Sequence, residues 1–222
     1  MVTTLKGVIW DMDGVLVDTG EFHFQSWMNT LTQYGIPFSR QIFNKTFGMN
    51  NEGILKLLKG EDFDAQIIQE ISERKEISFR QEIRGRVKTL PGALTLLESI
   101  QEENIPQAIG SSAPQKNIDA VIDDLKLDDY FDALVSAAEM PGKPDPAVFL
   151  IAAERIHAPS AHCVVLEDAI AGVEAARRAG MKCIAVTTTN PASSLQAADR
   201  IINRLDEISV GDLNALFDET SH

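Results

Sequence analysis

Residues 7–18 read GVIWDMDGVLVD, and this stretch decides the fold. The apolar run Gly7 to Trp10 has the length and continuity of a strand that is buried on both faces. Two carboxylates and a glycine follow it directly, in the order Asp11-Met12-Asp13-Gly14. The stretch therefore predicts a buried strand that delivers acidic side chains to its carboxyl end.

Short apolar runs alternate with helical patterns from about residue 88 onward. Further strands are expected at residues 106–109, 132–135, 162–166, 182–186 and 198–202. Helices are expected between them, at residues 92–103, 116–126, 145–156 and 169–179. This alternation predicts an α/β fold, a doubly wound parallel sheet with helices covering it.

Residues 19–86 interrupt the alternation. They carry only helical patterns, at residues 21–34, 39–47, 51–58 and 64–86. We therefore expect a catalytic core of residues 1–18 and 87–222 and a small all-helical cap of residues 19–86. Because open parallel sheets bind ligands at the carboxyl ends of their strands, a cap inserted after the first strand would act as a lid.

Composition excludes several classes of protein. The 222 residues include 20 Lys and Arg and 33 Asp and Glu, for a net charge of −13, which argues against nucleic acid or an anionic membrane as partner. No apolar run approaches the ~18 residues of a membrane span, and no signal peptide precedes the first strand. Cys163 and Cys183 lie in separate apolar runs, which favours buried free thiols. We expect a cytoplasmic monomer.

Polar side chains follow four of the expected strands. They are Asp11 and Asp13, Ser111 and Ser112, Lys143, and Glu167 and Asp168. In a parallel sheet all of them meet at one edge, where crowded carboxylates need a cation among them. Carboxylate oxygens suit Mg²⁺. The sequence predicts a magnesium site with Asp11, Asp13 and Asp168 as ligands, and with Glu167 as either a ligand or an outer carboxylate.

The same side chains could carry out phosphoryl transfer. Ser111 and Lys143 would bind a phosphoryl group beside the metal, and Ser112 would either contact it or only cap the next helix. Asp11 is placed to attack phosphorus because a carboxylate needs no deprotonation at neutral pH. Asp13, two residues on, could protonate the leaving oxygen and then deprotonate the attacking water.

This pattern resembles the haloacid dehalogenase superfamily. The resemblance rests on four motifs in order: Asp11-x-Asp13-Gly14, Ser111, Gly142-Lys143-Pro144-Asp145-Pro146, and Glu167-Asp168-Ala169-x-x-Gly172. It implies a Rossmann-like core with a helical cap, and Mg²⁺-dependent hydrolysis of a small phosphorylated metabolite through an aspartyl phosphate on Asp11. An acid at position 13 points to phosphoryl transfer, since dehalogenases of the superfamily typically lack it.

Three stretches of the cap region, residues 18–27, Phe47-Gly48 and Arg74-Lys75, resemble the β-phosphoglucomutase-like branch of the superfamily. The resemblance implies that His23 and Lys75 couple cap closure to the catalytic acid and that Gly48 touches the sugar. Trp27 lies four residues after His23, where it would either contact the sugar or pack in the cap. The candidates for cap function are Thr19, His23, Trp27, Gly48, Asn51 and Lys75.

The chain departs from the mutase pattern at two places. After Ser111 it has Ser112-Ala113-Pro114, where the mutase has further polar and basic side chains, and the second departure lies in the cap. The mutase arginine that binds a second phosphate falls at Asn51, or at latest at Glu52. We therefore expect a phosphatase, with sugar phosphates as the main substrate class. A phosphosugar mutase stays the alternative, since Arg40 or Lys45 could replace the missing cation. A receiver-like signalling module is a remote third alternative, because receivers are shorter and lack a cap.

Overall fold

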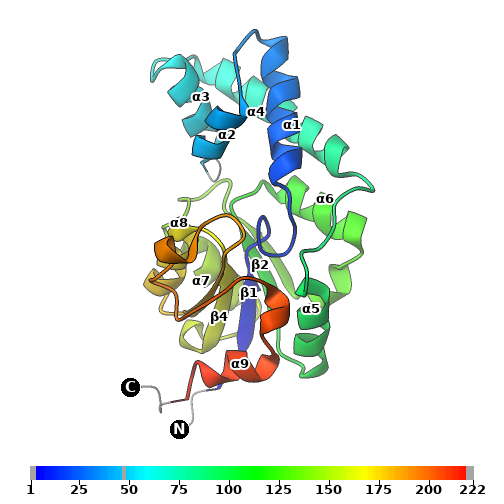
Figure 1. Cartoon of the computed structure of the whole chain (residues 1–222), viewed down its shortest axis with the longest axis vertical. Coiled ribbons are helices and arrows are strands. Elements are labelled where there is room, and N and C mark those ends of the chain that lie inside the picture. Colours follow the sequence, from blue (N-terminus) through cyan, green and yellow to red (C-terminus); the bar gives the residue numbers. More distant parts are fainter. Residues whose placement is uncertain (1–3, 47–48, 219–222) are drawn as a thin grey trace. The chain divides into compact units, whose positions relative to one another are not determined.

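The computed structural model describes residues 4–46 and 49–218. The chain divides into two compact units, which Figure 1 shows in sequence colours. The core unit comprises Met1–Asp18 and Lys88–His222, and the cap unit comprises Thr19–Val87. The cap expected from the sequence was residues 19–86.

The core unit contains a six-stranded parallel sheet. Its strands are β1 (Gly7–Trp10), β2 (Gln107–Ser111), β3 (Ala133–Ser136), β4 (Cys163–Glu167), β5 (Lys182–Val186) and β6 (Arg200–Ile202). Their order across the sheet is β3-β2-β1-β4-β5-β6. The doubly wound parallel sheet predicted from the alternation of apolar runs and helical patterns is confirmed.

The direction of winding reverses beside β1. Strands β2 and β3 extend the sheet on one side, and β4, β5 and β6 extend it on the other. β1 pairs with β4 in a register that sets Trp10 opposite Leu166, and the Asp11 amide donates to the Leu166 carbonyl at 2.9 Å. A reversal of this kind opens a crevice at the carboxyl ends of the two strands. The sheet therefore brings Asp11 next to the end of β4.

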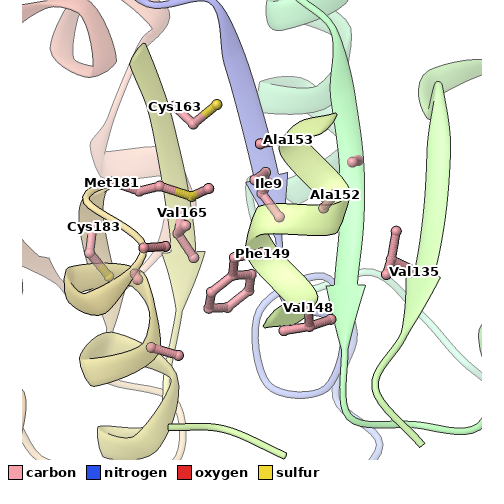
Figure 2. Packing of buried hydrophobic residues seen from close by; sticks show 14 of the residues in the cluster. Ile9, Val135, Val148, Phe149, Ala152, Ala153, Cys163, Val165, Met181 and Cys183 are labelled. Atoms are coloured by element: carbon pink, nitrogen blue, oxygen red, sulfur yellow. The ribbon is translucent and has the colours of Figure 1, made fainter. Parts of the chain in front are cut away.

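Helices α7 (Ala147–Arg155) and α8 (Ile170–Arg178) cover one face of the sheet. Figure 2 shows Phe149 of α7 beside Ile9 of β1 and Val165 of β4, and Val148 of α7 belongs to the same cluster of buried side chains. Burial of this apolar area is the main stabilising contribution to the core unit.

The opposite face carries Trp10, which is fully buried. Its indole N–H donates to Gln107 Oε1 at 3.0 Å, and Gln107 Nε2 donates to the Leu97 carbonyl at 3.1 Å. Leu97 belongs to α5 (Ala93–Glu102). This buried chain of hydrogen bonds ties β1 through β2 to the helix, so the strand that bears Asp11 is held from both faces.

The cap unit is all helical among its described residues. Its helices are α1 (Gly20–Gln33), α2 (Arg40–Thr46), α3 (Asn51–Lys59) and α4 (Ala65–Ile83). Side-chain caps begin two of them: Asn50 accepts from the Gly53 amide, and Asp64 accepts from the Gln66 and Ile67 amides. Trp27 of α1 and Leu55 of α3 share the cap's own hydrophobic core.

The structure corrects several element boundaries. The helix expected at residues 64–86 ends at Ile83, and the second expected strand begins at Gln107 and runs on through Ser111. The short helix α9 (Val210–Ala215) was not predicted, because six residues give too little periodicity. Also present are α6 (Gln115–Leu125) and the 3-10 helices Asp128–Tyr130, Ser160–His162, Ala192–Ser194 and Leu205–Glu207.

Two expectations from composition can be compared with the fold. Cys163 and Cys183 are both buried and free, as predicted. Burial raises the pKa of the Cys163 thiol to about 11 and also raises the pKa of Cys183. Both thiols are therefore protonated and unreactive at neutral pH. Among the described residues, no helix has both the length and the apolar character needed to span a membrane.

Candidate active site

The chain turns sharply after β1. The Leu16 and Val17 amides both donate to the Met12 carbonyl, and the Gly14 amide donates to the Val17 carbonyl. Gly14 has a φ of +88°, and a Cβ at this position would lie 2.0 Å from Asp168 Oδ2. Glycine is therefore required twice here, for the left-handed backbone and for the close approach of Asp168.

Three buried carboxylates meet at the ends of β1 and β4. Asp11, Glu167 and Asp168 each offer one oxygen, and these oxygens all lie within 4.8 Å of one another. They form the group that we call the acidic cluster. Asp11 comes from β1, and Glu167 and Asp168 come from the end of β4, so the sheet order itself brings them together.

Lys143 provides one positive charge to the acidic cluster. Its Nζ lies 2.6 Å from Asp11 Oδ1 and 2.7 Å from Glu167 Oε1, and 4.6 Å from the centre of the Phe149 ring. Only 7% of the Lys143 side chain is exposed. Burial alone would lower the pKa of Lys143, but Asp11 and Glu167 outweigh this and raise it. Lys143 is therefore a fixed cation at neutral pH.

Glu167 is already held by the protein. Its Oε2 accepts from the Asp168 amide at 2.7 Å and from the Ala169 amide at 2.6 Å, and its Oε1 accepts from Lys143. The carboxylate also fills the space beside Gly172, where an added Cβ would lie 1.7 Å from Oε1. With these contacts, Glu167 suits the outer position better than direct ligation.

The other two members of the acidic cluster have strongly raised pKa values. Burial, and then the charges of Glu167 and Asp13, raise the pKa of Asp11 to about 7, although Lys143 lowers it. Burial, Glu167 and Asp11 raise the pKa of Asp168 to about 8 against the lowering effects of Thr189 and Lys143. Three carboxylates facing one ammonium leave negative charge uncompensated. This donor set fits a hard divalent cation.

Sequence reasoning missed two residues of the site, Thr189 and Asn190. The Thr189 hydroxyl lies 2.5 Å from Asp168 Oδ2, and Asn190 Nδ2 donates to the Asp168 carbonyl at 3.0 Å. Both follow the end of β5, the neighbour of β4. The strand-end rule that identified the acidic cluster would have found them, had it been applied to the fifth strand.

The remaining candidates of the core unit have different surroundings. Ser111 ends β2, is buried, and its hydroxyl accepts from the Ala113 amide at 3.1 Å. Ser112 is exposed in the turn that follows. Asp13 is partly buried, and its carboxylate is not part of the acidic cluster. The predicted phosphate contacts of the serines and the metal contact of Asp13 stay predictions.

A second group of polar side chains lies inside the cap unit, where Lys75 and Glu76 are buried and His23 and Asn51 are partly buried. Lys75 Nζ lies 2.9 Å from His23 Nδ1 and 2.9 Å from Glu76 Oε1, and Asn51 Nδ2 donates to the same Glu76 oxygen at 2.7 Å. We call His23, Asn51, Lys75 and Glu76 the cap network. The sequence marked three of its members. Glu76 was missed, because a charged run on a helix usually lies in solvent.

The other cap candidates are placed as follows. Trp27 is buried in the cap's hydrophobic core, with Lys75 Nζ 5.6 Å from its ring. Thr19 is buried, and its carbonyl accepts from the His23 amide at 3.0 Å. Gly48 lies outside the described residues. Arg40 stacks on Phe24, with its guanidinium carbon 3.5 Å from the ring centre, and pairs with Glu21.

Comparison with known proteins identifies the family. The family model of haloacid dehalogenase-like hydrolases matches residues 8–186, which include the acidic cluster, Lys143 and all of β1 except Gly7. The chain belongs to the haloacid dehalogenase-like hydrolases. It is therefore an enzyme, and the family resemblance inferred from the four motifs is confirmed.

Individual relatives lie within the branch that the cap suggested. The β-phosphoglucomutase of Bacillus subtilis is 31% identical over 214 residues, covering 93% of this chain and 92% of the relative. A phosphorylated carbohydrates phosphatase of Thermotoga maritima is 31% identical over 185 residues, covering 81% and 84%. The crystal structure of a β-phosphoglucomutase from Clostridium difficile has the same fold, with a TM-score of 0.84 at 24% identity, covering 97% of this chain and 98% of that one.

Proposed function

We propose that this hydrolase is a phosphatase of small phosphorylated metabolites, with sugar phosphates as the main substrate class. The observation that carries the proposal is the acidic cluster with Lys143 in contact with Asp11 at 2.6 Å, at the point where the sheet reverses. Relatives named as phosphatases of phosphorylated carbohydrates and of fructose 1-phosphate support the substrate class.

Asp11 and Asp168 are the proposed magnesium ligands. Their raised pKa values and the excess of carboxylate over ammonium are what a bound divalent cation would relieve. Mg²⁺ supplies charge neutralisation for the phosphoryl oxygens when it is bound. Asp13 is the third predicted ligand, and Glu167 supports the site from outside through Lys143 and two backbone amides.

Asp11 is the proposed nucleophile. An oxygen of its carboxylate forms a bond to phosphorus while the bond from phosphorus to the ester oxygen breaks, and Asp13 gives that oxygen its proton. Asp13 then takes a proton from water, which attacks phosphorus and releases inorganic phosphate and the Asp11 carboxylate. Lys143, with Ser111 and Ser112 as expected partners, holds the phosphoryl oxygens in place.

A phosphosugar mutase is the second candidate, since the Bacillus subtilis relative has that name. A mutase must hold two phosphates, and the cap network offers no surplus cation for the second. Lys75 is balanced by Glu76, and the Asn51 amide donates to Glu76. Arg40 is engaged by Glu21 and Phe24. Lys45, exposed in the last turn of α2, stays the candidate cation for a second phosphate. The contacts of Lys75, Asn51 and Arg40 favour hydrolysis over isomerisation.

The test is phosphate release from a panel of sugar monophosphates with Mg²⁺, run beside conversion of β-glucose 1-phosphate to glucose 6-phosphate with a bisphosphate primer. We expect the wild type to release inorganic phosphate from one or a few sugar phosphates and to show no isomerisation. We expect Asp11→Asn to release no phosphate. Isomerisation faster than release would overturn the phosphatase assignment in favour of the mutase. Release that survives in Asp11→Asn would overturn the nucleophile assignment.

A further inference from the structure

The loop after β5 restrains only one of the two carboxylate oxygens of Asp168. Thr189 Oγ1 lies 2.5 Å from Asp168 Oδ2, and the same oxygen packs against the backbone of Gly14. Among residues 4–46 and 49–218, Asp168 Oδ1 accepts no hydrogen bond, so it is the carboxylate oxygen left for a cation.

Asn190 fixes the direction of the Thr189 hydroxyl. Asn190 Nδ2 donates to Thr189 Oγ1 at 3.1 Å and to the Asp168 carbonyl at 3.0 Å. The Thr189 hydroxyl has one proton and two acceptors in reach, Asp168 Oδ2 at 2.5 Å and the Asp168 carbonyl at 3.2 Å. The carbonyl already accepts from Asn190, and the shorter contact to a carboxylate oxygen is the stronger one, so the proton goes to Oδ2. Thr189 is exposed as a residue, yet its hydroxyl points inward within this chain of hydrogen bonds.

We infer that Thr189 is a positioning residue that makes Asp168 a one-oxygen ligand and so favours Mg²⁺ over Ca²⁺. This inference rests on the proposed function, in which Asp168 binds the metal. Mg²⁺ requires near-octahedral geometry with short, single-oxygen contacts, whereas Ca²⁺ also accepts both oxygens of a carboxylate at longer distances. Asp168 Oδ2 is already hydrogen-bonded to Thr189 and packed against Gly14. Asp168 can therefore offer a cation only its other oxygen, Oδ1, which is the single-oxygen contact that Mg²⁺ prefers.

The experiment is titration calorimetry of Mg²⁺ and of Ca²⁺ into the chelator-treated full chain, without substrate. For Thr189→Val we expect Mg²⁺ affinity to fall about tenfold, the lower end of the effect of groups that orient metal ligands, with a smaller change for Ca²⁺. Thr189→Ser keeps the hydroxyl and is expected to bind like the wild type. Asn190→Ala removes the hydrogen bond that orients the Thr189 hydroxyl but keeps the hydroxyl itself. We expect a smaller loss of Mg²⁺ affinity in this variant than in Thr189→Val.

Thr187→Val is the matched control, since it removes a threonine hydroxyl of the same loop that bonds to Asn203 Oδ1 at 3.0 Å. An unchanged ratio of Mg²⁺ to Ca²⁺ affinity in Thr189→Val would overturn the inference and leave the proposed function intact. An equal loss in Thr187→Val would also overturn it, because the effect would then belong to the loop as a whole. A wild type that binds no Mg²⁺ would overturn both the inference and the proposed metal site.

Discussion

The acidic cluster of the core unit and the cap network are both buried groups of charged side chains, but their charges add up differently. In the acidic cluster, three carboxylates face one lysine. In the cap network, Lys75 and Glu76 cancel, and His23 and Asn51 complete their hydrogen bonds. Burial acts on both groups, yet it raises the pKa of Asp11 while the pKa of Glu76 is lowered.

The cause of that difference is the local balance of charge. For Glu76, burial would raise the pKa, but Lys75, the Asn51 hydrogen bond and His23 together outweigh it. For Asp11, burial and the neighbouring carboxylates outweigh Lys143. A buried group that is balanced contributes to structure, and one that is left unbalanced is suited to bind an ion. Four experiments sharpen this comparison.

The largest effect is expected for Asp11→Asn. Turnover should fall on the order of 10⁴-fold or more, because the nucleophile is lost. The metal-free protein should also become more stable at pH 8. One of three crowded carboxylates is removed, and Lys143 keeps its ion pair with Glu167. Phosphate release and thermal unfolding with a chelator measure the two effects. The control is Asp119→Asn, which removes an exposed carboxylate of α6. A melting temperature that falls in Asp11→Asn and not in the control would contradict the view that the acidic cluster carries uncompensated negative charge.

Glu76→Gln is the corresponding change in the cap network, and it should act in the opposite direction. Removing the charge leaves Lys75, whose side chain is 4% exposed, without its counter-ion. We expect the free energy of unfolding to fall by about 3 kcal/mol, as when one partner of a buried ion pair is removed. Urea unfolding measures it. Glu52→Gln breaks an exposed ion pair with Lys56 and should change the free energy of unfolding little. Equal losses in both variants would show that the buried pair of Lys75 and Glu76 stabilises the fold no more than an exposed pair does.

The pH dependence of stability should separate the two groups next. The folded-state pKa values of Asp11, about 7, and Asp168, about 8, lie above the ordinary aspartate value of 3.8. Between about pH 4 and about pH 8 the folded protein therefore binds more protons than the unfolded protein. Its stability falls as the pH rises through this range. Urea unfolding of metal-free protein should show this slope. Mg²⁺ should restore more stability at pH 8 than at pH 5.

Variants locate the origin of that slope. Asp11→Asn should flatten it, because one of the two raised carboxylates no longer titrates. Glu76→Gln should lower stability without changing the slope between about pH 6 and 8, because the pKa of Glu76 is lowered in the folded protein and the group is charged in both the folded and the unfolded state there. A slope that survives unchanged in Asp11→Asn would place its origin outside the acidic cluster.

The smallest effect is expected for Arg40→Gln. Arg40 is 46% exposed, and it stacks on Phe24 and pairs with Glu21. Stability should fall by about 0.5–1 kcal/mol, the range of an exposed cation–ring contact. Phosphate release from a sugar monophosphate should be unchanged. Loss of an isomerase activity in this variant would instead show that Arg40 grips a second phosphate, and would favour the mutase.

The sequence by itself predicted the sheet, its winding and the approach of the acidic side chains. Gly7 to Trp10 is a continuous apolar run, and such local patterns determine strands without knowledge of the rest of the chain. Parallel strands end at one edge, so Asp11, Lys143 and Asp168 could be brought to one place by counting strands. The four motifs in order then gave the family. These inferences needed only local periodicity and one rule of topology.

Only the tertiary structure decided which partners each charged side chain has. Glu76 looked like part of a solvated run, but the packing of α4 buries it against Asn51, 25 residues earlier in the chain. Thr189 lies beyond the end of the neighbouring strand and donates to Asp168 across 21 residues of sequence. Glu167 is held by Lys143 and by the Asp168 and Ala169 amides, which come just before α8. The pKa of a buried group depends on burial and on neighbours distant in sequence, and neither is encoded in a local pattern. For this reason the sequence was enough to predict a metal site, whereas the tertiary structure was needed to show that three carboxylates of this site face a single lysine.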